Sequence, residues 1–291
     1  MRVERLARAP WCVLGAGRAG VAFATLLSRA GADVAVWTRS ERRAERAQRA
    51  LGFTVRHGDL PAFDGSRRWL LCTPDSVIPR LSAALTPHEG SLILHCAGSL
   101  PASAMATAWS GRRAACHPLQ SLRGVPEDLA ALEGAFFAVD GEGEARACAV
   151  ALAEHAGGNV GVIPSEAKAA YHAAAVVASQ GVSALLHMIE SWSQTWGIED
   201  DALRRGMAAL ASQSALNAGA LGATRAATGP VVRGDGTTIA RHMEALSGVH
   251  AFDLELYEQV QRRMLSIAEE RGVDPTALAS IRSALERQSE T

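Results

Sequence analysis

The chain has 291 residues, of which 48% are hydrophobic and 20% charged, and its formal net charge at pH 7 is -1. This length exceeds that of a usual single hydrophobic core, so we expect two domains. The near-zero charge and the scattered arginines argue against a nucleic-acid partner. No run of about 18 apolar residues predicts a membrane span, and the opening residues do not resemble a secretory signal. We therefore expect a cytoplasmic protein that binds neither nucleic acid nor membrane.

The five cysteines predict neither a disulfide framework nor a metal site, because their number is odd and no C-x-x-C pair occurs. Four of them lie in short apolar runs, where a free cysteine behaves as a small buried hydrophobe. Cys116 adjoins His117, and a thiol beside a histidine can be activated. We interpret Cys116 as a core residue as well.

Residues 11–163 alternate short apolar runs with helical stretches, which is the pattern of a parallel sheet covered by helices. After Pro164 the chain is rich in Ala, Leu, Glu and Arg and lacks comparable β-branched runs, which predicts helices. We predict an α/β domain with a doubly wound parallel sheet over residues 1–164 and an all-helical domain over residues 165–291. The expected strands are Trp11–Leu14, Asp33–Trp37, Trp69–Cys72, Ser91–Cys96, Ala114–His117, Phe136–Val139 and Asn159–Ile163.

A glycine-rich segment follows the first expected strand and opens a helix. It reads Gly15-Ala16-Gly17-Arg18-Ala19-Gly20. In a dinucleotide-binding Rossmann domain the first glycine of such a segment permits a tight turn, the second admits a pyrophosphate, and the third lets the helix approach the sheet. The phosphates would meet the positive end of the helix. The strand and helix around these glycines make a mere packing turn the less favoured interpretation.

The end of the second expected strand reads Thr38-Arg39-Ser40, with no carboxylate before Glu41. Sites for NAD(H) usually carry an acidic residue here, whereas an arginine suits the 2′-phosphate of NADP(H). The sequence favours NADP(H), with NAD(H) as the alternative. Further cofactor contacts are expected from Thr73 and Pro74 after the third strand.

A histidine ends another expected strand, in the segment from His117 to Ser121. His117 either faces the reacting groups or bonds to backbone in a loop, and the sequence leaves both open. The first helix of the second domain carries Lys168, Tyr171, His172 and Ser179 among alanines and valines. The spacing places Lys168, His172 and Ser179 on one face. Polar groups on an apolar helix face predict a cleft or pairing partners. We expect Lys168, His172 and His117 to be catalytic, and Ser121, Tyr171 and Ser179 to bind substrate.

The segment from Thr228 to Asp235 breaks the helical domain with two glycines and a proline. We expect Arg233 to bind a substrate carboxylate or a cofactor phosphate, and Asp235 to orient Arg233 or His172. The alternative is an interdomain ion pair, with Asp235 as a helix N-cap.

These segments together resemble a family of Rossmann-like proteins with a C-terminal helical domain of unknown function. That family is similar to pyrroline-5-carboxylate reductase, ketopantoate reductase and the 6-phosphogluconate and β-hydroxyacid dehydrogenases. The resemblance implies a helical domain like that of 6-phosphogluconate dehydrogenase, dimerisation through it, and an active site in the cleft between the domains. Lys168 matches the lysine of the β-hydroxyacid dehydrogenases, whereas His172 stands where those enzymes carry an asparagine.

The leading hypothesis is therefore an NADP-dependent oxidoreductase that transfers a hydride to or from a small carbonyl, hydroxyacid or imine substrate. Lys168 or His172 would supply the proton. The alternative is a regulatory or partner protein that binds NADP(H) without catalysis.

Overall fold

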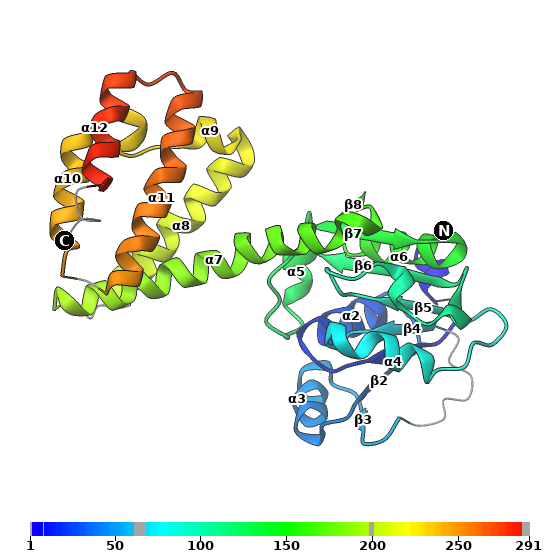
Figure 1. The fold of residues 1–291 in the computed structure, drawn as a ribbon. Coiled ribbons are helices and arrows are strands. Elements are labelled where there is room, and N and C mark those ends of the chain that lie inside the picture. The colour runs from blue at the N-terminus through cyan, green and yellow to red at the C-terminus, as the bar shows by residue number, and fades with distance from the viewer. Residues whose placement is uncertain (1, 8, 61–67, 198–200, 249, 287–291) are drawn as a thin grey trace. The chain divides into compact units, whose positions relative to one another are not determined.

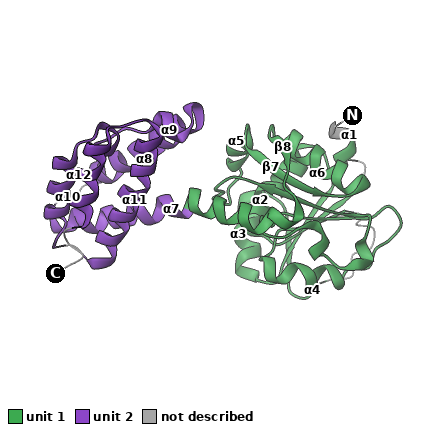
Figure 2. Ribbon diagram, turned by 45° about the horizontal axis from the view of Figure 1, so that its top comes forward, with its two compact units in different colours: residues 1–179 green, residues 180–291 purple. Residues whose placement is uncertain are grey.

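The structure is a computed structural model that describes residues 2–7, 9–60, 68–197, 201–248 and 250–286. It contains two compact units, which Figure 2 shows in green and purple. We call Met1–Ser179 the sheet unit and Gln180–Thr291 the helical unit. The sequence placed its domain division at residue 164, directly after the last strand. The division between the compact units lies farther along, within the long helix α7 (Lys168–Thr195).

A sheet of eight strands occupies the centre of the sheet unit (Figure 1). Its order is β3-β2-β1-β4-β5-β6-β7-β8. The order therefore reverses between β1 and β4, and open α/β sheets bind ligands at such a switch point. In chain order the strands are β1 (Trp11–Leu14), β2 (Val34–Thr38), β3 (Val55–His57), β4 (Arg68–Leu71), β5 (Leu92–His95), β6 (Arg113–Pro118), β7 (Phe136–Gly141) and β8 (Asn159–Val162).

Helices cover both faces of this sheet. Successive residues of a strand point to opposite faces, so each strand contributes to a hydrophobic cluster on either side. Trp11 and Val13 of β1 join one hydrophobic cluster, and Cys12 and Leu14 join another. The first cluster includes residues of α2 (Arg18–Arg29), α3 (Glu41–Leu51) and α6 (Gly143–His155). The second includes residues of α4 (Ile78–Ala83) and of the short helix η3 (Thr107–Trp109). The predicted α/β fold, with a doubly wound sheet and a helical C-terminal region, is confirmed, and the sheet is mostly parallel.

Two features of the sheet differ from the prediction. The short strand β3 was not expected, and it pairs with β2 at the sheet edge. The expected strand Phe136–Val139 forms β7, but it runs antiparallel to β6. The connection between β6 and β7, which includes α5 (Asp128–Leu132), returns to the end of the sheet from which it left. The remaining strand pairs are parallel.

The helical unit contains the end of α7 and five further α-helices among its described residues. Its main core lies between α10, α11 and α12, where Ile239, Leu265 and Ile281 are buried. Asp274 precedes α12 and accepts hydrogen bonds from Thr276 N and Ala277 N. The five helices are α8 (Asp201–Leu221), α9 (Ala223–Ala226), α10 (Gly236–Ala245), α11 (Ala251–Glu270) and α12 (Pro275–Glu286).

One stretch among the described residues, Ser165–Thr195, is long and apolar enough to cross a membrane by length and composition. Its first part, up to Ser179, belongs to the sheet unit, where Lys168 is fully buried. A span needs about 20 consecutive residues in lipid. By length and composition alone, one such helix is weak evidence for a membrane span.

All five cysteines are free. Cys12, Cys116 and Cys148 are buried, and burial raises the pKa of each thiol. The Cys116 thiol donates a hydrogen bond to the Ala149 carbonyl, 3.5 Å away, rather than to a histidine. These three side chains are core residues, as the sequence predicted.

Candidate functional site

The glycine segment has the geometry that the sequence predicted for it. Gly15 adopts a φ of +113°, and a Cβ there would lie 2.3 Å from the Cys72 carbonyl oxygen. A Cβ on Gly20 would lie 1.8 Å from the Gly15 oxygen, so a side chain there would prevent α2 from approaching the turn. Gly17 is the residue before α2, and a Cβ there would meet nothing within 4 Å. The first turn of α2 therefore presents open backbone, as a pyrophosphate site requires.

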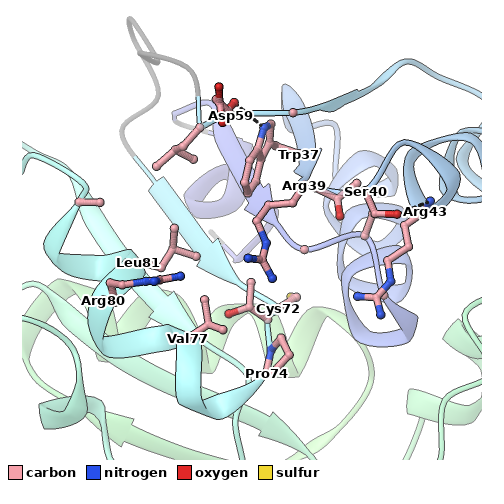
Figure 3. A pocket seen from close by; sticks show the side chains of 18 residues that line it. Trp37, Arg39, Ser40, Arg43, Asp59, Cys72, Pro74, Val77, Arg80 and Leu81 are labelled. Atoms are coloured by element: carbon pink, nitrogen blue, oxygen red, sulfur yellow. Dashed lines mark hydrogen bonds between the residues drawn. The ribbon is translucent and has the colours of Figure 1, made fainter.

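A pocket of about 800 Å³ adjoins this turn. Figure 3 shows Arg39, from the end of β2, and Arg80, from α4, reaching into it, with Arg43 nearby on α3. None of these three arginines forms an ion pair with another described residue, and Asp59 is the carboxylate among the described lining residues. The pocket is therefore strongly cationic and suits an anionic ligand.

Aromatic and hydroxyl side chains also line the pocket. Trp37 is held by a hydrogen bond from its Nε1 to the Asp59 carbonyl oxygen, 3.1 Å away. Ser40 accepts a hydrogen bond from Arg43 N and caps α3. Thr38 lines the pocket and is 5% exposed. Thr73 and Pro74, which follow β4, line the pocket as well. The Thr73 hydroxyl is buried and lacks a hydrogen-bond partner among the described residues, so it is available to a ligand.

A second group of polar side chains gathers within the sheet unit, around Gly98 after β5. His117 Nδ1 lies 3.0 Å from the Tyr171 hydroxyl, and the two rings meet edge to face. His117 and His172 also meet edge to face, with ring centroids 5.8 Å apart. A Cβ on Gly98 would lie 2.5 Å from His172 Nδ1 and 2.8 Å from His117 Nε2. The expected residues His117, Tyr171 and His172 therefore form one cluster, which we call the histidine cluster.

Lys168 begins α7 beside this cluster and is fully buried. Its ammonium nitrogen has no hydrogen-bond partner among the described residues, and the same holds for His172 Nδ1. Burial lowers the pKa of Lys168, although the charge of Asp140 opposes this shift. A buried ammonium without a hydrogen-bond partner is costly, so it indicates a position meant for a ligand.

Burial keeps His117 and His95 neutral. Burial lowers the pKa of His117 to about 4, and the charges of His172 and Lys168 act in the same direction. Burial likewise lowers the pKa of His95 to about 4. His95 is held on both sides, since its Nδ1 accepts from Ala97 N and its Nε2 lies 3.1 Å from the Pro101 oxygen. His95 is therefore a fixed neutral neighbour of the site.

The other expected site residues make local contacts. Ser121 is exposed, and its backbone N–H donates to its neighbour Gln120. Ser179 is exposed on α7, and its hydroxyl donates to the Ala175 carbonyl oxygen. Arg18 is exposed at the start of α2, where Ala19 is half-buried.

Arg233 and Asp235 belong to the helical unit. Arg233 is exposed in the short helix η5 (Val231–Arg233). Asp235 accepts from Thr238 N at 3.0 Å and caps α10. This is the capping alternative that the sequence left open.

Sequence reasoning did not identify Arg80 or His95, and it did not place Gly98 against the two histidines. Arg80 has a weak signal, because it follows the strand end at Thr73 and Pro74 within the next helix. The segment Cys96-Ala97-Gly98-Ser99 ends the expected strand Ser91–Cys96, but nothing in it indicates that two histidines converge on Gly98.

Part of the chain matches a known family model, and its fold is similar to that of solved structures. Residues 135–264 match a domain of unknown function, DUF2520. A protein from Thermotoga maritima is similar in structure with a TM-score of 0.70 and 23% identity, over 90% of this chain and 99% of the other. A protein from Bacteroides fragilis that carries a provisional assignment as an NADP oxidoreductase gives 0.73 and 22%, over 90% and 99%.

A reductive aminase from Aspergillus terreus, in complex with NADPH and ethyl levulinate, gives a TM-score of 0.57 and 19% identity, over 97% of this chain and 93% of the other. No match is found among curated proteins. The structural likenesses show a shared fold. With the DUF2520 match, they confirm the predicted resemblance to Rossmann-like proteins whose helical domain has no known function.

Proposed function

We propose that the protein is an oxidoreductase that uses NADP(H) and acts on a small carbonyl, hydroxyacid or imine substrate. The observation that carries this proposal is the arginine-lined pocket beside the glycine turn. A Rossmann turn accounts for dinucleotide binding in general, and the pocket adds three cations where the adenosine ribose of such a cofactor would lie. The names of the Bacteroides fragilis and Aspergillus terreus proteins agree with this class.

The residues of this chain fit NADP(H) better than NAD(H). Arg39 follows β2, where an NAD(H) site would carry a carboxylate, and it offers bidentate hydrogen bonds to a 2′-phosphate. Arg43 and Arg80 add charge to the same pocket. Gly17 and the first turn of α2 would hold the pyrophosphate.

The proton chemistry belongs to Lys168 and the histidine cluster. When bound, the nicotinamide supplies or accepts a hydride. Lys168 Nζ or His172 Nδ1 then gives or takes the proton at the reacting group, since both atoms are buried and have no partner among the described residues. The lowered pKa of Lys168 brings its proton exchange closer to neutral pH.

Calorimetric titration with NADPH and NADH tests the cofactor. We expect NADPH to bind more tightly, and Arg39→Asp to weaken NADPH binding roughly 10- to 100-fold because a charge-assisted contact is lost. Arg49→Asp is the matched control, because Arg49 is exposed on α3 and does not line the pocket. Equal affinity for both cofactors in the wild-type protein would contradict the NADP(H) preference. No binding of either would contradict the whole proposal.

Turnover is tested with a panel of ketones, hydroxyacids and cyclic imines, followed by NADPH absorbance. Lys168→Met and His172→Ala should each lower kcat roughly 100- to 10,000-fold while NADPH affinity is kept. Gln180→Ala is the control, because Gln180 is exposed on the same helix. Unchanged kcat in both variants would remove the two residues from the mechanism.

We also propose that the protein is a cytoplasmic homodimer that associates through the helical unit, with no nucleic-acid or membrane partner. The five free cysteines suit a reducing compartment. Helix α8 has no buried residue in this chain. Two of its leucines, Leu210 and Leu221, expose 65% and 49% of their surface. These leucines are eleven residues apart and so lie on one side of the helix, where a second copy would cover them.

A further inference from the structure

A second pocket opens between helices α2 and α3, next to the one that Arg39 lines. Its volume is about 230 Å³. On the α2 side it is lined by Gly17 and by Val21, one helical turn farther on. On the α3 side it is lined by Arg43 and by Ala47, again one turn farther on. Val21 and Ala47 are buried and form its floor. The pocket is therefore a groove that runs along both helices, and we call it the α2–α3 groove.

Three arginines line the α2–α3 groove: Arg18, Arg43 and Arg46. None of them forms an ion pair with another described residue. No carboxylate is among the described residues that line the groove. All three arginines are exposed, so their guanidinium groups are accessible to a ligand. The groove therefore concentrates positive charge without a carboxylate to neutralise it.

The positions of these arginines are unfavourable in the absence of an anion. Arg43 and Arg46 are three residues apart on α3, so their like charges lie close together and repel each other. Arg18 is the first residue of α2, where the helix dipole disfavours a cation. The first turn of α2 contains no acidic residue, and Gly17 provides no side-chain cap. An anion in the groove would offset the repulsion and satisfy the positive end of the helix.

The chemistry of the groove suits a phosphate group better than a carboxylate. A phosphate dianion carries two charges and three acceptor oxygens, whereas a carboxylate carries one charge and two oxygens. Guanidinium groups pair with phosphate through two parallel hydrogen bonds. A water molecule takes up about 30 Å³ in the liquid, so the groove has room for a phosphate group together with water.

We propose that the α2–α3 groove binds a phosphate dianion through Arg18, Arg43 and Arg46. Two sources carry this chemistry: a free phosphate or phosphorylated metabolite, and the 2′-phosphate of NADP(H). The site goes beyond the proposed function, which assigns the pocket of Arg39 and Arg80 to the dinucleotide, and only the second source rests on that function. Arg43 lines both pockets and stands apart from Arg39 and Arg80 in Figure 3.

Phosphorus-31 NMR titration with inorganic phosphate tests the site without a dinucleotide. At about pH 8 phosphate is a dianion, and we expect saturable binding. Arg46→Gln should weaken this binding roughly 10-fold or more, because a charge-assisted contact is lost. Arg42→Gln is the matched control, since it removes the same charge from the same helix at an exposed position that lines neither pocket. No saturable binding, or equal weakening by the two variants, would overturn the proposal.

Arg39→Gln separates the groove from the cofactor pocket. Arg39 lines that pocket and does not line the groove. In about 0.15 M salt, where distant charges are screened, this variant should reduce phosphate affinity no more than Arg42→Gln does, while NADPH affinity falls. Equal loss of phosphate affinity in Arg39→Gln and Arg46→Gln would place the phosphate in the cofactor pocket and overturn the proposal. Normal phosphate binding with no NADPH binding would contradict the proposed function alone.

Titration of Arg46→Gln with NADPH and NADH identifies the source of the phosphate. If the cofactor supplies it, the variant binds NADPH roughly 10-fold more weakly than wild type and keeps its affinity for NADH. NADPH then also displaces inorganic phosphate from the wild-type protein. If a separate ligand supplies it, the variant keeps its affinity for both dinucleotides, and inorganic phosphate still binds the wild-type protein at saturating NADPH.

Discussion

Gly98 makes the arrangement of the histidine cluster sensitive to a single methyl group. A Cβ there would lie within 3 Å of nitrogens of His117 and His172, so at least one ring must move. We expect Gly98→Ala to lower kcat at least about 100-fold through misplacement of these rings, with NADPH affinity within about twofold of wild type. Gly206→Ala is the control, since nothing lies within 4 Å of that position in α8. Wild-type kcat in Gly98→Ala would contradict the role of the cluster.

His95 makes stability depend on pH. Its pKa is lowered to about 4 by burial, whereas an unfolded histidine titrates near pH 6.5. Between these values the unfolded chain binds the proton more readily, so stability falls as pH falls. His95 should account for a loss of about 2 kcal/mol between pH 7.5 and pH 5.

Urea unfolding at both pH values measures this contribution. His95→Gln should reduce the acid loss by that amount, because glutamine titrates in neither state. The exposed His187 provides the control substitution, His187→Gln. The same acid loss in His95→Gln and in wild type would show that His95 is not the source.

At the scale of elements, the segment before α5 is built around one carboxylate. Asp128 is 1% exposed and accepts hydrogen bonds from the backbone N–H groups of Arg123, Gly124 and Val125, at 2.8, 2.7 and 3.3 Å. Against the opposing effect of burial, these bonds hold its pKa below the usual value. A Cβ on Gly124 would lie 3.2 Å from Arg18 Cα, so this segment packs on the start of α2.

Asp128→Ala should therefore act on both stability and cofactor binding. Three N–H groups would lose their acceptor, at a cost of about 3 kcal/mol by urea unfolding. NADPH affinity should also fall, because the segment beside α2 loses its anchor. Glu127→Ala, at the exposed neighbour, should do neither. Full NADPH affinity in Asp128→Ala would show that the segment does not support the cofactor site.

The elements that could be predicted are those with a strong local pattern. The buried strand β1 is a continuous apolar run that the glycine segment follows, and β4 and β5 each contain three consecutive apolar residues. β3 has three residues, of which Val55 is buried, so its pattern is too short to predict. The antiparallel direction of β7 depends on the path of the chain and leaves no trace in local periodicity.

The candidate site could be predicted in part for a related reason. Lys168, Tyr171 and His172 occupy adjacent turns of one helix, so their spacing predicts that they lie together. Tertiary structure alone brings Arg80 to the arginine-lined pocket and Gly98 to the histidine cluster. Ser179 shares the helix face expected for Lys168 and His172, but it lies at an exposed position beyond the cluster. Helix spacing therefore predicts which side chains share a direction and does not predict which of them are buried.

For the whole molecule, the exposed leucines of α8 predict association. Leu210→Arg should shift the protein from dimer to monomer in sedimentation velocity, because a charge would be buried in the apolar contact. Ser212→Arg is the control, since two residues along a helix lie about 200° apart. A wild-type monomer at micromolar concentration, or a Leu210→Arg dimer as stable as wild type, would contradict the proposed interface.

The burial of the thiols has a practical consequence for spectroscopy. Cys12, Cys116 and Cys148 are hidden, and the pKa of Cys72 is also raised by burial, so these four should resist maleimide reagents at neutral pH. A cysteine introduced at Arg49, on the surface of α3, would then be the preferred attachment point for a fluorophore or spin label. Cofactor binding beside α3 could be followed as a change in that label, without removing most of the native thiols.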